Sequence, residues 1–323
     1  MSPYGSDRSP RRPMRRKLLQ ALTAGLVLAT ATGCSYTWKD FPRLGMPTPV
    51  TEEAPRILSL WQGSWAAALA TGVLVWGLIL WSVIFHRRSR SKVEVPPQTR
   101  YNMPLEALYT VVPLIMVSVF FYFTARDEAK ILSLSEKPKH TINVIGFQWS
   151  WGFNYIEDVD GAAGGTPAAK SKELESIPDK YKEDFPANAE GVYTKGVPGD
   201  RNPQTGNPGP TLWLPKGEKV RFILSSNDVI HSFWVVPFLF KQDVIPGHTN
   251  VFEVTPTAEG TYMGKCAELC GVDHSRMLFN VKVVSPERYQ QHLKELAEKG
   301  QTGFLPAGIE QTEPARNAET NKL

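Results

Sequence analysis

Residues 57–85 have the sequence ILSLWQGSWAAALATGVLVWGLILWSVIF, in which no side chain carries a charge. The run is longer than the about 20 apolar residues that an α-helix needs to cross the hydrocarbon core of a membrane. A buried helix of a soluble protein rarely combines this length with this apolarity. The sequence therefore predicts a first transmembrane helix over residues 57–85.

A second apolar run covers residues 105–125 and holds a single charge, Glu106, at its start. We expect a second transmembrane helix over residues 104–126. The connecting loop, residues 86–103, contains one acidic residue, Glu94, and these basic residues: Arg87, Arg88, Arg90, Lys92 and Arg100. Because loops rich in lysine and arginine stay in the cytoplasm, the chain after Arg126 is expected on the outer side.

The N-terminal segment, residues 1–33, has the pattern of a secretory signal peptide, with basic residues, a short apolar run and small residues in that order. The Gly33-Cys34 junction resembles a bacterial lipoprotein cleavage site, which predicts lipidation of Cys34. Ordinary cleavage, with Cys34 left as a spectator thiol, is the alternative. Either cleavage leaves residues 34–56 as an outer N-terminal segment. The net charge of +4 is mild and indicates no nucleic-acid binding.

After the second helix, residues 138–285 predict an antiparallel all-β sandwich or barrel, because short strand-like runs alternate with Pro, Gly and Asn. The runs cover residues 141–145, 149–155, 212–214, 219–224, 233–236, 251–255, 261–264 and 277–284. Between residues 157 and 210 the composition changes to Gly, Pro, Ala, Lys, Glu and Asp, which indicates an insertion. A loop of this length is usually functional or disordered, and we favour a docking role. Residues 286–323 predict a C-terminal helix followed by a disordered tail.

Two of the three cysteines lie in the sequence Cys266-Ala-Glu-Leu-Cys270-Gly-Val-Asp-His274-Ser-Arg-Met277. Two thiolates, an imidazole and a thioether form a ligand set for a soft, redox-active metal, and copper is the first candidate. A mononuclear blue-copper site needs only one cysteine. The second cysteine therefore favours a centre in which two copper ions share both thiolates. On the outer side there is no reducing cytosol, so a bound metal would be what keeps the two cysteines as thiolates.

A further nitrogen donor is needed if each of two copper ions is to have four ligands, and His231 is the candidate. A lone histidine at the start of a strand is more often structural, so this role for His231 depends on the Cys266–Met277 loop. A backbone carbonyl between the two cysteines completes the set. Sharing one unpaired electron between two thiolate-bridged ions keeps bond-length changes small on reduction, which favours fast electron transfer.

The chain resembles subunit II of the haem-copper cytochrome c oxidases, in a bacterial lipoprotein-like version. The resemblance extends from the first helix to about Val284. The sequences His231-Ser-Phe-Trp, Lys241-Gln-Asp-Val-Ile-Pro-Gly and Gly264-Lys-Cys-Ala-Glu-Leu-Cys-Gly-Val-Asp-His-Ser-Arg-Met277 follow the family's binuclear copper motif. Gly146-Phe-Gln-Trp149-Ser-Trp151 and Glu106-Ala-Leu-Tyr-Thr-Val-Val-Pro113 resemble its aromatic stretch and the start of its second helix, but are weak signals alone. The resemblance implies a transmembrane helical hairpin followed by an all-β, cupredoxin-like extracytoplasmic domain.

The resemblance also implies a role for each residue of the metal set. One copper ion would be bound by His231 and Met277, the other by His274 and the carbonyl of Glu268, and Cys266 and Cys270 would bridge both. The Glu268 side chain would reach a magnesium or manganese site that is shared with the catalytic subunit.

Three residues outside the copper ligands acquire roles from the resemblance. Trp149 would receive electrons from a cytochrome c haem, and Asp228 would lie on the docking surface. Glu106 would stand at the mouth of a proton pathway. Two simpler interpretations stay open: Trp149 as a core or membrane-interface aromatic, and Glu106 as an interfacial charge without a proton role.

The implied function is that of the subunit through which electrons enter a respiratory cytochrome c oxidase of the bacterial cell membrane. It would accept electrons from a cytochrome c and pass them to catalytic subunit I, where oxygen is reduced to water and protons are translocated. The sequence departs from the family at Phe147, where a histidine is usual, and in the insertion. It contains no Cys-x-x-Cys-His motif, so we expect no haem in this chain. The donor is then a separate cytochrome, for which the cytochrome c of a cytochrome bc complex in a supercomplex is one candidate.

Two other functions stay open on the sequence. A membrane-tethered copper carrier or storage protein would deliver copper rather than electrons, but such proteins tend to use Met/His-rich or open thiol sites. A quinol-oxidase type of subunit II shares the two helices and the fold, but it lacks the Cys, His and Met ligands.

Overall fold

The computed structural model describes residues 41–87, 98–135, 138–157, 191–199 and 209–303, together with Gln20, Val95, Gly206 and Leu305. The expected signal peptide, apart from Gln20, and Cys34 lie outside these residues, as does most of the expected insertion. A short 3-10 helix, η1 (Phe41–Arg43), belongs to an N-terminal unit that ends at Gly45. The remaining described elements belong to a second unit that begins at Met46.

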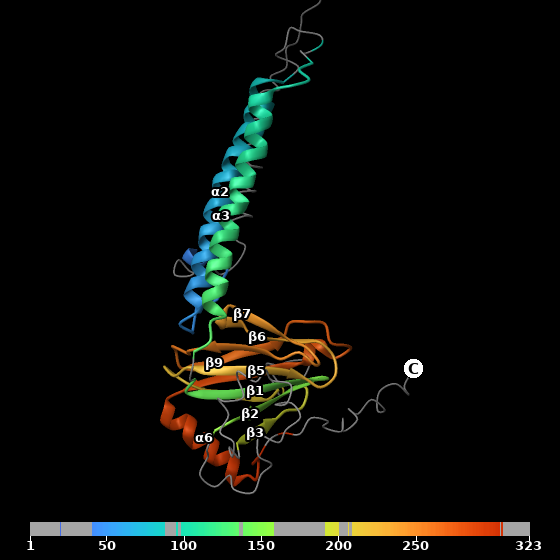
Figure 1. Ribbon diagram of the computed structural model, residues 1–323. Helices are drawn as coiled ribbons and strands as arrows, with labels where there is room; N and C mark the ends of the chain where they lie inside the picture. Colours follow the sequence, from blue (N-terminus) through green and yellow to red (C-terminus); the bar gives the residue numbers. More distant parts are fainter. Residues whose placement is uncertain are drawn as a thin grey trace, which may run out of the picture. The chain divides into compact units, whose positions relative to one another are not determined.

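The long helices α2 (Ala54–Phe85) and α3 (Met103–Ile131) run side by side in opposite directions (Figure 1). Both are long and apolar enough to cross a membrane. Large apolar side chains along them, such as Val73, Trp76 and Phe121, point outward and are more than half exposed. A continuous exposed apolar surface of this kind requires lipid or a partner helix around it. The two helices cover the residues that the sequence predicts as spans, 57–85 and 104–126.

Within the described residues, the strands of the domain after α3 form two five-stranded sheets, in the orders β3-β2-β1-β5-β8 and β4-β10-β9-β6-β7. β1 pairs in parallel with β5 and β10 with β4, while the other pairs are antiparallel. The strands are β1 (His140–Phe147), β2 (Ser150–Tyr155), β3 (Val192–Lys195), β4 (Thr211–Pro215), β5 (Val220–Ser226), β6 (His231–Val235), β7 (Phe240–Val244), β8 (Asn250–Val254), β9 (Gly260–Cys266) and β10 (Leu278–Val284). Two apolar helices followed by an all-β domain confirm the predicted fold class.

Aromatic side chains from both sheets fill the core of this domain. Trp151, Phe222, Phe233 and Phe279 are almost completely buried. The rings of Phe233 and Phe279 are stacked with their centroids 4.9 Å apart. Each buried aromatic side chain contributes about 2–3 kcal/mol by removing apolar surface from water. The C-terminal helix α6 (Pro286–Glu298) packs against β3 and β4 and buries Tyr289 and Leu293.

Each run predicted to be a strand overlaps a strand of the structure, but β3 and β7 have no counterpart in the sequence prediction. β3 lies inside the range 157–210 that we interpreted as an insertion, yet Val192 is fully buried and the strand pairs with β2. β3 is the edge strand of its sheet. Residues 301–303 lie along it, because Tyr193 N donates to Gln301 O over 3.0 Å and Gly303 N donates to Gly191 O over 2.7 Å.

A buried ion pair attaches the segment after α3 to the β domain. Arg221 on β5 and Glu253 on β8 lie 2.8 Å apart with 2% of each side chain exposed. The Glu253 carboxylate also accepts hydrogen bonds from the backbone N–H and the hydroxyl of Ser135. A buried charge pair is favourable only when its remaining hydrogen-bonding capacity is also satisfied, and Ser135 provides that. Before α2, Glu52 N donates to Thr255 O over 3.0 Å.

At the start of β1, the imidazole of His140 lies between two carboxylates. Nδ1 is 2.8 Å from Glu157 Oε1 and Nε2 is 2.6 Å from Glu218 Oε2. Tyr289 on α6 donates its hydroxyl to Glu157 over 2.7 Å, and Lys139 pairs with Glu218. Burial alone would lower the pKa of His140, but its hydrogen bonds to the two carboxylates and their charges outweigh burial and raise it. His140 therefore stabilises the fold in its charged form.

This raised pKa gives a prediction for stability against pH. Unfolded histidine titrates near pH 6.5, so the stabilisation is fully present below about pH 6.5 and is lost as the pH rises through the raised pKa of folded His140. His140→Gln should cost about 2 kcal/mol at pH 6, the magnitude of hydrogen bonds to a charged group, and should flatten the pH dependence above pH 7. Urea unfolding of the full-length protein in detergent at pH 6, 7, 8 and 9 measures both effects.

The matched control is His292→Gln. Burial lowers the pKa of His292 to about 4, so this histidine is neutral in both states above pH 7. Its replacement should leave the slope between pH 7 and 9 unchanged. An equal slope in wild-type protein and His140→Gln would contradict the assignment.

Candidate metal centre

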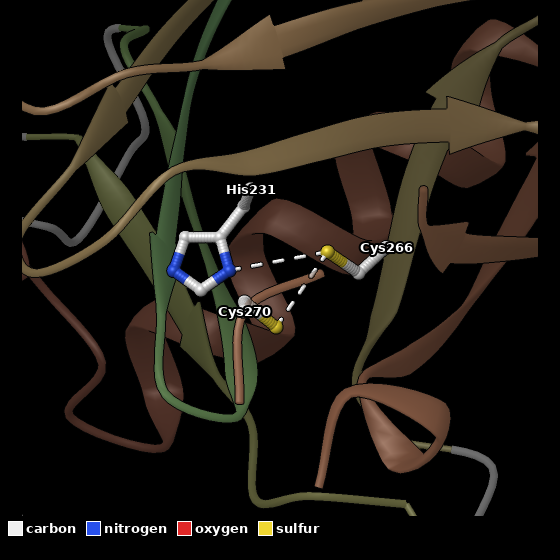
Figure 2. A group of neighbouring side chains, drawn as sticks. All are labelled: His231, Cys266 and Cys270. Carbon is white, nitrogen blue, oxygen red and sulfur yellow. Dashed lines mark hydrogen bonds between the residues drawn. The ribbon is translucent and has the colours of Figure 1, made fainter. Parts of the chain in front are cut away.

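Two neighbouring strands, β6 and β9, provide the first two donor residues of the site. β6 and β9 are antiparallel, with Phe233 opposite Cys266, so that His231 at the start of β6 and Cys266 at the end of β9 lie at one edge of the sheet. The chain then forms the loop 267–277, which contains the 3-10 helix η5 (His274–Arg276), before β10 begins. Figure 2 shows the Cys266 sulfur joined by dashed lines to the His231 imidazole and to the Cys270 sulfur.

The structure brings the predicted donor atoms together. The Cys266 and Cys270 Sγ atoms are 3.9 Å apart, and His231 Nδ1 is 3.9 Å from Cys266 Sγ. The ligand atoms of these three residues all lie within 4.8 Å of one another. The remaining donors contact the two sulfurs: Glu268 O lies 3.2 Å from Cys266 Sγ, His274 Nδ1 3.5 Å from Cys270 Sγ and Met277 Sδ 3.6 Å from Cys270 Sγ.

This geometry fits a soft metal. A metal–thiolate bond is about 2.3 Å long, so one ion can contact both sulfurs when they are less than about 4.6 Å apart. Thiolate, thioether and imidazole donors select copper over hard cations such as calcium. Cys266, Cys270 and Met277 are also buried, which limits access of water to a bound ion.

Asp228 fixes the orientation of His231. The Asp228 Oδ1 atom lies 2.8 Å from His231 Nε2, and Oδ2 accepts a 2.6 Å hydrogen bond from Gln148 N. Burial alone would raise the pKa of Asp228, but the hydrogen bonds to His231, Gln148 and Val229 outweigh it and lower the pKa. A carboxylate on the outer nitrogen of a histidine is the usual support of a metal ligand, because it leaves the other nitrogen free to bind the ion.

The contact between the two cysteine sulfurs shifts their pKa values in opposite directions, so that Cys266 favours the thiolate and Cys270 the thiol. Their mutual hydrogen bond lowers the pKa of Cys266 to about 3, helped by His231. The same contact raises the pKa of Cys270, and burial raises it further. Two neighbouring thiolates repel each other unless a cation lies between them. Binding of a metal to both sulfurs therefore releases the proton of Cys270.

Side chains from the turn between β1 and β2 and from β2 itself donate hydrogen bonds to the backbone of the cysteine loop. Trp149 Nε1 and Gln148 Nε2 both donate to Cys270 O, over 3.1 and 2.7 Å. Trp151 Nε1 donates to Met277 O over 3.3 Å. Gly271 has a φ of +125°, and a Cβ atom there would be 2.9 Å from Trp149 Nε1, so only glycine fits between the loop and this ring.

Some supporting residues were not identified from the sequence. Gln148 and Trp151 lie in the aromatic stretch beside Trp149, but their hydrogen bonds to Cys270 and Met277 depend on long-range folding. Gly271 carried a usable signal, since a glycine next to a ligand cysteine often marks a backbone conformation with positive φ.

The other predicted residues are distributed as follows. Trp149 is 8% exposed and contacts the cysteine loop. Asp228 directs both carboxylate oxygens into hydrogen bonds within the site. The Glu268 side chain is exposed. Glu106 is not near the donor atoms; it lies in the first turn of α3, where its carboxylate accepts a hydrogen bond from Asn102 N over 3.0 Å. Since Asn102 in turn accepts from Leu105 N, this is a helix-capping pair.

A hairpin of two helices long and apolar enough to span a membrane, followed by a β sandwich with a thiolate, imidazole and thioether site, is typical of a membrane-anchored redox subunit. Residues 207–284 match the family model described as "Cytochrome C oxidase subunit II, periplasmic domain". The "Probable cytochrome c oxidase subunit 2" of Streptomyces avermitilis is 81% identical over 323 residues, and that of Streptomyces coelicolor is 79% identical, each over 100% of both chains. The "Cytochrome c oxidase subunit 2" of Mycobacterium tuberculosis is 38% identical over 91% of this chain and 85% of that protein. The chain belongs to the cytochrome c oxidase subunit 2 family.

Family membership decides between the functions that the sequence left open. The chain is the subunit that receives electrons in an oxidoreductase complex, and it works together with other oxidase subunits. Two helices that are able to span a membrane and a matched domain of the periplasmic type fit a membrane protein with an outer domain. Family membership thus favours the oxidase subunit over the alternative of a copper carrier or storage protein.

Proposed function

We propose that this chain holds two copper ions in one thiolate-bridged centre and uses them to take electrons from a cytochrome c. The observation that carries the proposal is the meeting of four donor atoms around two cysteine sulfurs that are 3.9 Å apart. Cys266 and Cys270 would bridge both ions. His231 and Met277 would be the further ligands of one copper ion, and His274 and the carbonyl of Glu268 the further ligands of the other. The bound pair would supply one-electron redox chemistry.

The protein's contribution is to hold these donors still. Cys266 N donates to Met277 O over 3.0 Å, and Ala267 N donates to Ser232 O over 3.0 Å, so that the end of the ligand loop is bonded to β9 and its start to β6. Asp228 and Trp151 fix the His231 ring and the Met277 backbone, as described above. Ligands on a rigid scaffold change their distances little when the electron arrives, which supports fast transfer.

The first test is the spectrum of the copper-loaded, full-length protein. An electron shared equally by two copper nuclei gives a seven-line hyperfine pattern in electron spin resonance, while a single copper gives four lines. Cys266→Ser should abolish the seven-line pattern because it removes a bridging thiolate. Met277→Leu should keep the pattern but shift the reduction potential and slow transfer. A four-line pattern in wild-type protein would exclude the two-copper centre.

We also propose that Trp149 is the point at which the electron arrives. Its indole N–H is bonded to the carbonyl of a bridging cysteine, which links the ring directly to the ligand loop. Exposed apolar side chains flank the ligands: Val229 and Ile230 precede His231, Leu269 lies between Glu268 and Cys270, and Val272 follows Cys270. An exposed apolar group of this kind is typical of a surface for a protein partner.

Replacement of this tryptophan gives the second test. Trp149→Phe keeps an apolar ring but removes the hydrogen bond to Cys270 O. Electron uptake from a reduced cytochrome c should fall by about 10-fold to 100-fold, as for other losses of an oriented contact in a reaction path. The copper spectrum should stay unchanged. Stopped-flow reduction kinetics measure the rate, and an unchanged rate would remove Trp149 from the path.

The insertion is proposed to bind the donor, which we suggest is the membrane-tethered cytochrome c of a cytochrome bc complex. A deletion must spare β3, because Val192 is part of the core. Deleting residues 160–189 should therefore weaken association with that complex without changing the copper spectrum. Co-purification of the two complexes measures this association. In a control variant, residues 160–189 are replaced by a Gly/Ser sequence of equal length, which keeps the length of the segment and removes its sequence. Unchanged association in both variants would argue against the docking role.

Further parts of the proposal rest on the family relationship. The exposed carboxylate of Glu268 would help to bind magnesium or manganese at the boundary with catalytic subunit I. Glu106 would stand at a proton pathway in addition to capping α3. The signal peptide would be removed, Cys34 lipidated, and the copper domain held on the outer face of a bacterial cell membrane. The complex would couple oxygen reduction to proton translocation.

A further inference from the structure

Gly199, which follows β3, is bonded directly to the ligand loop. Gly199 N donates to Arg276 O over 2.9 Å, and Arg276 Nε donates back to Gly199 O over 3.0 Å. The two residues therefore form a reciprocal pair in which both the backbone and the side chain of Arg276 take part. Arg276 stands between two donors of the metal centre, His274 and Met277.

Arg276 also stabilises the turn that contains His274. Its guanidinium lies 3.4 Å from Asp273 Oδ1. Within η5, Arg276 N donates to Asp273 O over 2.9 Å and Met277 N donates to His274 O over 3.2 Å. The side chain thus bonds the start of the turn to Gly199, and the position of His274 is determined from both sides.

A second contact lies just beyond Met277. Gly209 has a φ of +88°, and a Cβ atom there would be 2.0 Å from Leu278 O, so the two backbones are in direct contact. Asn280 N donates to Pro210 O over 2.9 Å. Gly199 therefore contacts the ligand loop at Arg276, and Gly209 contacts Leu278, the first residue of β10, so that the two contacts lie on either side of Met277.

The segment that carries Gly199 is itself part of the sandwich. β3 pairs with β2 with Lys195 opposite Gly152, and Gly196 N donates to Trp151 O over 3.1 Å. Trp151 is the same residue that binds Met277 O. Residues 192–199 thus form a fixed support for the ligand loop.

We propose that Arg276 is a positioning residue for the metal centre, which holds His274 and Met277 in place by bonding the ligand loop to Gly199. This inference rests on the proposed two-copper function. Arg276 donates no ligand, so its removal leaves all six donors present. Residues that orient metal ligands typically change metal affinity by about 10-fold to 100-fold when replaced. Loss of the Arg276 guanidinium should lower copper affinity by about 10-fold and alter the copper hyperfine splitting.

The test uses the full-length protein in detergent, loaded with copper. Arg276→Ala removes the side-chain contacts, and Arg276→Lys should restore part of the effect because its ammonium group still donates to Gly199 O. Gly199→Pro removes the N–H that donates to Arg276 O and changes no residue of the ligand loop; Gly199→Ala, which keeps that N–H, is its matched control. Arg288→Ala removes a different ion-paired arginine, on α6, and should resemble wild-type protein.

Copper affinity from chelator competition, the hyperfine splitting and the reduction potential are measured for each variant, with thermal unfolding as the check on folding. The expected order of copper affinity is wild type, then Arg276→Lys, then Arg276→Ala, with Gly199→Pro below Gly199→Ala. If Arg276→Ala and Gly199→Pro match their controls in all three measurements while wild-type protein holds the copper pair, the positioning role is wrong and the two-copper function stands. If wild-type protein gives a four-line spectrum, the two-copper function itself fails.

Discussion

The pairing of β6 with β9 is the constraint on which the site depends. With Phe233 opposite Cys266, the first residue of one strand and the last residue of the other lie next to each other. Phe233 also stacks on Phe279 in the core, so a change of register would displace a buried aromatic ring along with the donors. Because the same residues that form the core determine where the ligand loop begins, the geometry of the donors is linked to the stability of the sandwich.

The polar groups around the donors show how a buried site of this kind is kept in order. The carbonyl of Cys270 accepts from both Gln148 and Trp149, and Asp228 connects the backbone of Gln148 to the ring of His231. A buried polar group that loses its partner is unfavourable by about 1–3 kcal/mol, so each of these contacts penalises a displaced loop. The ligand set is therefore held by the surrounding fold even before an ion is bound.

The parts of this structure that follow from local patterns could be predicted from the sequence. Two long apolar runs, the first without charge and the second with Glu106 alone, predicted both helices, and the spacing of Cys266, Cys270, His274 and Met277 predicted the donor loop. β3 could not be predicted, because its four residues lie in a polar stretch and become a strand only by pairing with β2 and with residues 301–303. Gln148 and Arg276 were missed for a similar reason: each binds a backbone atom more than 70 positions away in the chain.

The Arg221–Glu253 pair has a consequence for how ionic strength acts on this protein. Salt weakens attractions between exposed charges over about 10 Å, but it hardly reaches a pair that is enclosed by protein. Since this enclosed pair holds Ser135, shortly after the second helix, salt should hardly affect the attachment of the β domain to the helices. If the rate of electron delivery depends on salt, the dependence should therefore reflect the approach of the electron donor and not a change in how the β domain is attached to the helices.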